Sequence, residues 1–384
     1  MVTIVGARPQ FIKAAAVSRA VRTSFPEMIR EVIIHTGQHY DDDMSKVFFK
    51  EMEIPEPDYH LEVGSGNHGY QTGEIIRRTE ETLLAEKPDV VLVYGDTNTT
   101  MAGAIAASKL HFPIAHIEAG LRSFNKSMPE EINRIVCDHL STFLFSPTLT
   151  GIKNLIREGF AEHAKPPFSI DNPGIYHCGD VMLDNALYFT DKAEESSHIL
   201  EELDLKAKEF VLCTLHRNNN TDSALRLNAI MDTLNEISRG RQIQFILPLH
   251  PRTAKMLPVM LESGLRESIK ANPFFRVTAP VTYFDMLLLE SRCRMIITDS
   301  GGVQKESYFF RKPCLVLRPE SEWKELLEAG TAVITDAEPG KIKLAFDLYY
   351  SQPPDRFPPL FGDGKAAEFI LGELVKFLAP GLVK

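Results

Sequence analysis

The sequence predicts an α/β protein of two domains, each built on a doubly wound parallel sheet. Apolar runs at residues 90–94 and 210–215 have the length and composition of buried strands, and helical stretches separate them from the next apolar runs. Strands that alternate with helices through short links are typical of a parallel sheet. The 384 residues are enough for two domains of about 100–200 residues each. Prolines and a glycine at 161–175 indicate a linker, so we expect domains at 1–165 and 175–358.

The overall composition excludes several classes of function. The net charge is −10, so no diffuse basic field is available for nucleic acid or for an anionic membrane surface. No apolar run approaches the ~18 residues needed to span a bilayer, and we expect no signal peptide because the chain opens on a strand. The five cysteines form no CxxC pair and lie mostly in apolar runs. This pattern favours reduced thiols in a cytoplasmic protein over a zinc site.

The most informative stretch is 295–317. An apolar run is followed by the turn Ser300-Gly301-Gly302, a helical stretch and a second apolar run, which is the order of a strand, a turn, a helix and a strand. Because two glycines leave the first N–H groups of the helix uncovered, this turn is suited to bind phosphate. Glu306, about one turn further, could accept hydrogen bonds from ribose hydroxyls. The alternative is an ordinary glycine turn with a solvent-facing glutamate.

Polar side chains follow several expected strands in the first half of the chain. Ligands of parallel sheets bind at the carboxyl ends of the strands, so polar residues that recur at this position favour a functional edge. Asp96 taken alone is also compatible with a helix N-cap, and Lys13 adds positive charge near one helix start. The residues that come just after an apolar run are Arg8, His39, Asp96 and Glu118.

A further helix is expected to begin at Pro129. Glu130 and Arg134 lie four residues apart in this helix, so their side chains share one face. The spacing by itself leaves open whether the two residues form only a surface ion pair.

The second half of the chain repeats the alternation of strands and helices. One histidine at a strand end is often structural. Two histidines and two arginines at the carboxyl ends of neighbouring strands favour a site for an anion. The residues at these strand ends are His216, Arg217, His250, Ser300 and Arg318.

With these residues in hand, the chain resembles the non-hydrolysing UDP-N-acetylglucosamine 2-epimerases over essentially its whole length. Seven motifs in the same order make the resemblance specific. They are GARPQFIK at 6–13, TGQH at 36–39, YGDTNTT at 94–100, HIEAGLRS at 116–123, PEEINR at 129–134, LHR at 215–217 and TDSGGVQKE at 298–306.

The resemblance implies a fold and a reaction. The fold is two doubly wound domains that face one another across a cleft, as in the GT-B glycosyltransferases, with the last helix, 365–384, returning to the first domain. The reaction inverts C2 of a UDP-2-acetamido sugar through elimination of UDP, a 2-acetamidoglucal intermediate and re-addition of UDP. It needs acid/base groups on both faces of the sugar ring, cations for the leaving UDP, and neither a redox cofactor nor a metal. A cytoplasmic homodimer is expected, with a UDP-sugar as its ligand.

The resemblance also implies roles for individual residues. The acid/base carboxylates would be Asp96, Glu118 and Glu130, with the adjacent Glu131 a weaker choice. His216 would be the catalytic histidine near the pyrophosphate. The remaining substrate-binding residues would be Arg8, Ser300, Gly301, Gly302 and Arg318 at the phosphates, Glu306 at the ribose, and Lys13 and Arg134 in support of the site. Some bacterial members bind a second UDP-sugar as an activator, and the matching positions here are Gln38, His39, Arg217 and His250.

Two departures from the family pattern bear on the substrate. The family's His-Arg-Arg-Glu-Asn is His216-Arg217-Asn218-Asn219-Asn220 here, and its Arg-x-x-Thr-Glu-Arg-Pro-Glu becomes a segment with Ser-Glu-Trp at 321–323. The Ser-Glu-Trp variant is closer to relatives that act on UDP-2,3-diacetamido uronic acids. UDP-N-acetylglucosamine is placed first, and the diacetamido uronate second.

Two other functions fit the same fold class. A UDP-sugar glycosyltransferase shares the fold, and fold alone does not fix function. Transfer to an acceptor does not require the carboxylates of the first domain, however. A catalytically inactive UDP-sugar sensor would have no need to keep these carboxylates and His216.

Overall fold

The computed structural model describes residues 1–37 and 52–378, apart from the side chains of Arg8 and Pro251. The chain forms two compact units, one of Met1–Asn185 with Pro359–Lys384 and one of Ala186–Pro358. Each unit contains one sheet, and every pair of strands in both sheets is parallel. The expected fold class, two doubly wound parallel-sheet domains, is confirmed. The predicted second UDP-sugar site includes Gln38 and His39, which lie outside the described residues.

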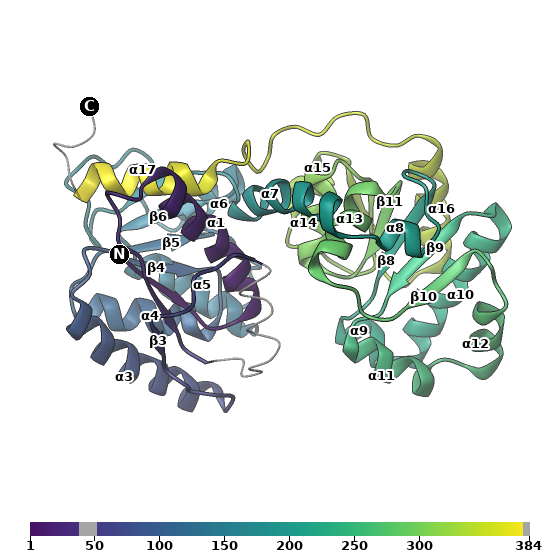
Figure 1. The fold of residues 1–384 in the computed structure, drawn as a ribbon, viewed down its shortest axis with the longest axis horizontal. Coiled ribbons are helices and arrows are strands. Elements are labelled where there is room, and N and C mark those ends of the chain that lie inside the picture. The colour runs from purple at the N-terminus through teal and green to yellow at the C-terminus, as the bar shows by residue number, and fades with distance from the viewer. Residues whose placement is uncertain (38–51, 379–384) are drawn as a thin grey trace. The chain divides into compact units, whose positions relative to one another are not determined.

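The first sheet has the strand order β3-β2-β1-β4-β5-β6-β7, and helices cover it on both faces (Figure 1). The chain moves outward from β1 to one edge and from β4 to the other, so the loops that follow these two neighbouring strands part from each other. The elements of this unit are β1 (Val2–Val5), α1 (Arg8–Ser24), β2 (Val32–His35), β3 (Tyr59–His60), α3 (His68–Glu86), β4 (Val91–Tyr94), α4 (Asn98–Lys109), β5 (Ile114–Ile117), α5 (Pro129–Leu140), β6 (Phe143–Ser146), α6 (Leu149–Arg157), β7 (Gly174–His177) and α17 (Ala366–Leu378).

The second sheet has the order β10-β9-β8-β11-β12-β13, which places the same reversal between β8 and β11. Helix α7 (Val181–Ser196) leads into this unit from the first one. The other elements are α8 (Ile199–Glu202), β8 (Phe210–Thr214), α9 (Asn218–Thr221), α10 (Ala224–Arg241), β9 (Gln244–Pro248), α11 (Pro251–Met260), α12 (Ser263–Lys270), β10 (Phe275–Thr278), α13 (Tyr283–Arg292), β11 (Met295–Thr298), α14 (Gly301–Phe309), β12 (Cys314–Val316), α15 (Lys324–Glu328), β13 (Ala332–Ile334) and α16 (Pro339–Ser351).

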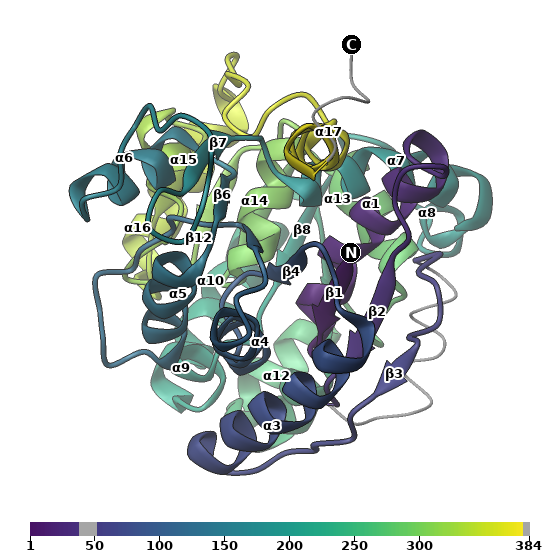
Figure 2. The ribbon, with the colours of Figure 1, turned by 90° about the vertical axis from the view of Figure 1, so that its left-hand side faces the viewer.

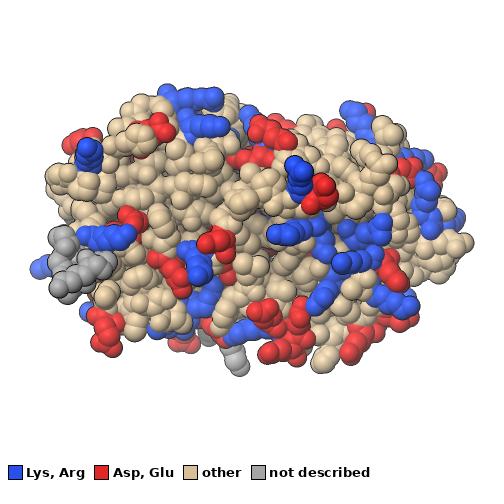
Figure 3. Space-filling view, turned by 90° about the horizontal axis from the view of Figure 1, so that it is seen from above, with Lys and Arg blue, Asp and Glu red and all other residues tan. Residues whose placement is uncertain are grey.

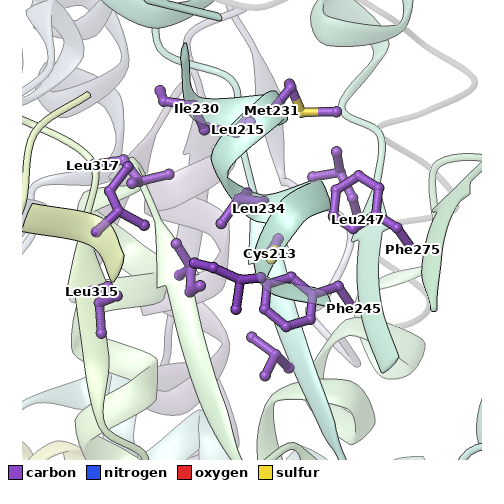
Figure 4. Packing of buried hydrophobic residues seen from close by; sticks show 14 of the residues in the cluster. Cys213, Leu215, Ile230, Met231, Leu234, Phe245, Leu247, Phe275, Leu315 and Leu317 are labelled. Carbon is purple, nitrogen blue, oxygen red and sulfur yellow. The ribbon is translucent and has the colours of Figure 1, made fainter. Parts of the chain in front are cut away.

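Each unit has its own hydrophobic core between sheet and helices. In the second unit, Cys213 of β8 and Leu215, just after this strand, pack with Leu234 of α10 and Phe245 of β9 (Figure 4). The first unit has a matching cluster in which strand residues such as Val93 pack against the small residues of α4. Because strands buried on both faces read as continuous apolar runs, these central strands could be recognised in the sequence.

A buried glutamine fixes the turn after β1. The Gln10 side chain accepts hydrogen bonds from the Gly6 and Ala7 N–H groups at 2.9 and 3.1 Å. Its amide nitrogen donates to the Tyr94 carbonyl oxygen, at the end of β4, at 3.1 Å. One fully buried side chain therefore ties the two neighbouring strand ends of the first sheet together.

The last described helix belongs to the first unit, and Figures 1 and 2 both show α17 beside α1. The Asp184 carboxylate accepts the Ala366 and Ala367 N–H groups at 3.1 and 2.8 Å, where two otherwise unsatisfied donors begin α17. Burial raises the pKa of Asp184 to about 6, against the opposing effect of these two hydrogen bonds.

The chain changes unit later than the predicted linker at 161–175. Strand β7 begins at Gly174, near the end of that segment, and it pairs with β6 as the last strand of the first sheet. The boundary between the units is at Asn185–Ala186, inside α7. Proline content marked an irregular segment correctly, but it carried no information about which sheet the next strand would join.

Charges of both signs cover the surface. On the face in Figure 3, Lys and Arg side chains lie among Asp and Glu side chains over both units. Among the described residues, no helix is long and apolar enough to cross a membrane.

Gly120 provides a test of how the loop after β5 packs. Its φ is +79°, and a Cβ there would overlap the Gly151 carbonyl oxygen of α6. Gly64 has a similar φ of +73° with no atom within 4 Å of the same position. We expect both alanine variants to pay about 1–2 kcal/mol for left-handed backbone. Gly120→Ala should lose about 1–3 kcal/mol more to overlap.

Urea unfolding of the two variants and of the wild-type protein measures this difference. Equal losses for Gly120→Ala and Gly64→Ala would show that the loop after β5 does not pack closely on α6.

Candidate active site

Two carboxylates follow neighbouring strands at the carboxyl edge of the first sheet. Asp96 comes after β4 and Glu118 directly after β5, and the Gly95 N–H donates to the Ile117 carbonyl oxygen at 2.9 Å across these strand ends. Glu118 has a φ of +78°, a conformation that is uncommon for a residue with a side chain and that often marks a functional position. The expectation that Asp96 and Glu118 lie on one edge is thus met by the geometry.

Each of these carboxylates is paired with a cation from a different helix. Lys13 of α1 forms an ion pair with Glu118, and Arg134 of α5 forms one with Asp96. The side chain of Lys13 is only 10% exposed. A Cβ on Gly95 would lie 2.8 Å from the Lys13 Nζ atom, and the φ of Gly95 is +64°. The left-handed backbone therefore favours glycine at this turn, and a larger residue would also displace the end of the lysine.

The two glutamates at the start of α5 differ in their surroundings. Glu131 is 1% exposed and accepts hydrogen bonds from the Ser123 and Phe124 N–H groups at 2.8 and 2.9 Å. Arg134 also donates to it at 3.2 Å. Burial alone would raise the pKa of Glu131, but these donors bring it below the usual value. Glu131 therefore holds the loop before α5 in place as a buried carboxylate.

Glu130 is exposed on the first turn of α5. The surface ion pair with Arg134 that the i,i+4 spacing left open is not formed, because Arg134 pairs with Asp96 and Glu131 instead. Of the two adjacent glutamates, only Glu130 has its carboxylate open to a ligand.

His116 takes part in a buried network that the sequence analysis did not single out. The ring is fully buried on β5, with Nδ1 2.7 Å from Asp138 Oδ1 and Nε2 2.8 Å from the Gly95 carbonyl oxygen. Burial lowers the pKa of His116, but nearby Cys137 and Asp138 raise it, and the net pKa is well above the usual value. An imidazolium has two N–H donors, which matches the two acceptors on either side.

This network continues to Arg122, whose guanidinium lies 2.7 Å from both Asp138 and Glu158. The charged groups of the network therefore hold the turn that carries Asp96. Both His116 and Arg122 belong to the motif HIEAGLRS, which was the only signal for them in the sequence.

The carboxyl edge of the second sheet, called here the second rim, is formed by the residues that follow β8, β11 and β12. Asp299, to which the sequence assigns no role, organises this rim. Asp299 is fully buried after β11 and accepts the N–H groups of His216 and Arg217 at 2.9 and 3.1 Å. The Asn220 amide donates to the same carboxylate at 3.0 Å and to the Leu317 carbonyl oxygen at 2.8 Å. Asp299 and Asn220 together therefore join the strand ends of β8, β11 and β12.

His216 lies at this rim with its ring partly open. Its Nδ1 is 3.5 Å from Asp299 Oδ1, and its ring centroid is 5.5 Å from that of His250. Burial lowers the pKa of His216. Asp299 opposes that effect, while Arg217, His250 and Arg318 add to it. A neutral imidazole among cations is suited to receive a proton when an anion arrives and offsets their charge.

The glycine turn follows β11 as the sequence predicts, with Ser300 as the N-cap of α14. The Ser300 hydroxyl accepts the Val303 N–H at 3.4 Å. The Glu322 carboxylate occupies the space that a Cβ on Gly301 would need, and it also accepts from Arg318 at 2.8 Å. Arg318, Gly301 and Ser300 therefore lie on the same rim as His216.

Glu306 is half-buried on the second turn of α14. Near it, Glu290 of α13 is 1% exposed, and its side-chain oxygens have no hydrogen-bond partner among the described residues. Burial and, second, the charge of Glu306 raise the pKa of Glu290 well above the usual value, because both disfavour a second negative charge at this buried position.

Two further predicted residues, Arg8 and His250, lie at the starts of helices. Arg8 is the first residue of α1, and its side chain is outside the description. His250 is the N-cap of α11, where its Nδ1 accepts the Arg252 N–H at 3.2 Å. In the described residues, no group of three or more His, Cys, Asp and Glu side chains is placed to hold a metal ion.

Comparison with known proteins gives matches over nearly the whole chain. The sequence model of the UDP-N-acetylglucosamine 2-epimerase family matches residues 24–375. A UDP-N-acetylglucosamine 2-epimerase homolog of Methanococcus maripaludis is 46% identical over 96% of this chain and 97% of its own. The UDP-2,3-diacetamido-2,3-dideoxy-D-glucuronate 2-epimerase of Pseudomonas aeruginosa is 44% identical over 98% and 99%. The crystal structure of Methanocaldococcus jannaschii UDP-GlcNAc 2-epimerase with UDP-GlcNAc and UDP has a TM-score of 0.81 at 39% identity, covering 97% and 98%.

The protonation state of His216 can be measured directly. We expect its imidazole to titrate below the ordinary value of about 6.5 in the free protein, because burial and the neighbouring cations disfavour the imidazolium. The unfolded chain then binds the extra proton more readily, so the native state loses stability relative to His216→Gln as the pH falls through that region. NMR titration of the histidine ring signals, with His216→Gln to identify the one that disappears, checks this. A His216 pKa at or above 6.5 would contradict the described environment.

Proposed function

Because the chain belongs to the UDP-N-acetylglucosamine 2-epimerase family, we propose that it interconverts UDP-N-acetylglucosamine and UDP-N-acetylmannosamine. The observation that carries this proposal is the pair of carboxylates, Asp96 and Glu118, on adjacent strand ends, each held by a buried or half-buried cation. Proton transfer at a carbon atom needs such positioned carboxylates. They have no evident use in a protein that only binds a nucleotide sugar.

The reaction consists of an elimination of UDP followed by its re-addition, and the proton returns to the opposite face of C2. A base removes the C2 proton, the C1–C2 double bond forms, and the C1–O bond breaks with its electron pair going to the UDP oxygen. The UDP oxygen then attacks C1 again while an acid delivers a proton to the other face of C2. We assign the acid/base roles to Asp96, Glu118 and Glu130, with Lys13 and Arg134 holding the first two in position.

The second rim supplies the groups for UDP. N–H groups at the start of α14 and a nearby guanidinium stabilise the charge that develops on the leaving pyrophosphate. His216, whose pKa is lowered by burial and by the neighbouring cations, can donate a ring N–H to that anion, and Glu306 is suited to accept the ribose hydroxyls. The residues assigned to UDP are Arg8, His216, Ser300, Gly301, Gly302, Glu306 and Arg318.

A second substrate, a UDP-2,3-diacetamido uronic acid, has one specific observation in its favour. The Pseudomonas aeruginosa relative that is 44% identical over almost the full chain is named for this activity. The same elimination chemistry applies to both sugars, since they differ only at C3 and C6. We keep UDP-N-acetylglucosamine first because two relatives, of 38% and 39% identity, are named for it.

The assembly and regulation follow from the family resemblance alone. We expect a cytoplasmic homodimer. Arg217 and His250 flank His216 on the second rim, and with Gln38 and His39 they form the predicted site for a second, activating UDP-sugar.

Proton NMR of the purified enzyme in D2O, after dialysis against a chelator, tests the reaction. We expect each accepted UDP-sugar to gain deuterium at C2 and to equilibrate with its C2 epimer without added nicotinamide or divalent ion. Rates on UDP-N-acetylglucosamine and on the diacetamido uronate decide the substrate. A tenfold or greater kcat/KM for the uronate, about 1.4 kcal/mol, would reverse our ordering. A requirement for NAD would refute the mechanism.

The adjacent glutamates of α5 form a matched pair for mutation. We expect Glu130→Gln to lower kcat by about 10²-fold or more, the usual worth of an acid/base group, with unfolding unchanged because its side chain is exposed. Glu131→Gln should instead destabilise the protein by about 1.5–3 kcal/mol, since a buried charged acceptor of several hydrogen bonds is weakened. Turnover and chemical denaturation of both variants measure the contrast. If only Glu131→Gln lost turnover while both stayed equally stable, the two roles would be exchanged.

A further inference from the structure

The single tryptophan of the chain, Trp323, lies against the glycine turn at the start of α14. Its side chain is buried, at 5% exposure, and its Nε1–H donates to the Gly301 carbonyl oxygen at 2.9 Å. The ring is therefore packed inside the protein and not exposed to solvent. Its one polar atom is directed at the turn that the proposed function assigns to phosphate.

The geometry of a peptide bond gives this contact a consequence. The Gly301 carbonyl and the Gly302 N–H belong to one planar trans peptide group, so they point in opposite directions. A side chain that fixes the carbonyl therefore also fixes the direction of the Gly302 N–H. That N–H is in the first turn of α14, where no carbonyl within the helix can pair with it, and such groups bind phosphate.

The turn needs this restraint because it contains two consecutive glycines. Glycine has the widest choice of backbone conformations and is among the poorest helix formers. A Cβ at Gly301 would meet the Glu322 carboxylate, which would have to move. Because neither glycine has a side chain of its own to restrain it, contacts from neighbouring residues add to the rigidity of the turn.

Several contacts join residues 321–323 to α14. The Ser321 hydroxyl donates to the Gln304 side chain at 2.6 Å and accepts the Trp323 N–H at 3.1 Å. Lys305, which is 3% exposed, places its Nζ 4.6 Å from the Trp323 ring centroid. A cation over the face of an indole attracts its π electrons and so makes the N–H a stronger donor. Trp323 is thus held from two sides with its N–H directed at Gly301.

We propose that Trp323 is a positioning residue for UDP, whose indole aims the N–H groups at the start of α14 toward the pyrophosphate. The proposal rests on the proposed function, since it assumes that UDP binds at this turn. It also goes further, because it assigns Trp323 to the part of the ligand that every candidate substrate shares. The tryptophan then acts on binding of UDP itself and not on the choice between sugars.

Calorimetric titration with UDP tests the proposal on three proteins. Trp323→Phe keeps an aromatic ring and loses only the N–H donor. Tyr349→Phe is the matched control, since Tyr349 is a buried aromatic in the same unit whose hydroxyl donates to the Gly330 carbonyl oxygen at 2.8 Å. We expect UDP to bind Trp323→Phe about threefold to tenfold more weakly, the worth of one hydrogen bond. Tyr349→Phe should bind UDP as the wild-type protein does.

Kinetics extend the test to the sugar. The same factor should appear in KM for each UDP-sugar that the enzyme accepts, because all of them carry the same pyrophosphate. An effect confined to one sugar would overturn the proposal in favour of a contact with the sugar. Equal UDP affinity of wild type and Trp323→Phe would overturn it as well.

The wild-type protein offers a second measurement that does not depend on the variant folding. With one tryptophan in the chain, selectively excited emission reports on Trp323 alone, and UDP at the Gly302 N–H should change it. If UDP binds by calorimetry and the emission stays constant, the proposal is wrong. If wild-type protein binds no UDP at all, the proposed function itself falls, which separates the two failures.

Discussion

Both sheets reverse their strand order next to their first strand, and the candidate functional groups depend on that reversal. In the first sheet the loops after β1 and β4 part, and in the second those after β8 and β11 do so. Backbone groups at these positions lose the neighbour that a continuous sheet would give them, so they are available to side chains or ligands. Asp96, His216 and Ser300 all follow one of these four strands.

Buried charged side chains form hydrogen bonds with some of these unpaired backbone groups. Asp299 accepts two N–H groups after β8, and His116 donates to the Gly95 carbonyl oxygen after β4. Burial of a charge is costly unless it is paired and hydrogen-bonded, and both groups meet that condition. Asp299 is bonded by three donors, while His116 lies between Gly95 and Asp138. The first residues after these strands are therefore held in place, and the residues that follow them in each loop are open to ligands.

The sequence was sufficient for the strands, the glycine turn and the edge on which polar residues gather, because all of these follow from local patterns. It was insufficient wherever the answer depended on a partner far away in the chain. Glu130 and Glu131 are adjacent and chemically alike, and only the loop at Ser123 and Phe124 decides which one is buried. Asp299 received no role from the sequence, because its neighbours in the chain give no sign that it binds the N–H groups of His216 and Arg217. The boundary at Asn185 depends on β7 pairing with β6, which composition cannot show.

The same distinction limits where a preference between sugars can arise. Of the positions that depart from the family pattern, Trp323 is buried against Gly301. Its side chain is not available to a sugar. The exposed departures are Asn218, Asn219 and Lys324, and of these only the lysine offers a charge that could meet a uronate carboxylate. A neutral C6 hydroxyl needs no such partner. Phosphate binding and the preference between sugars therefore depend on different residues, even where those residues are neighbours in the chain.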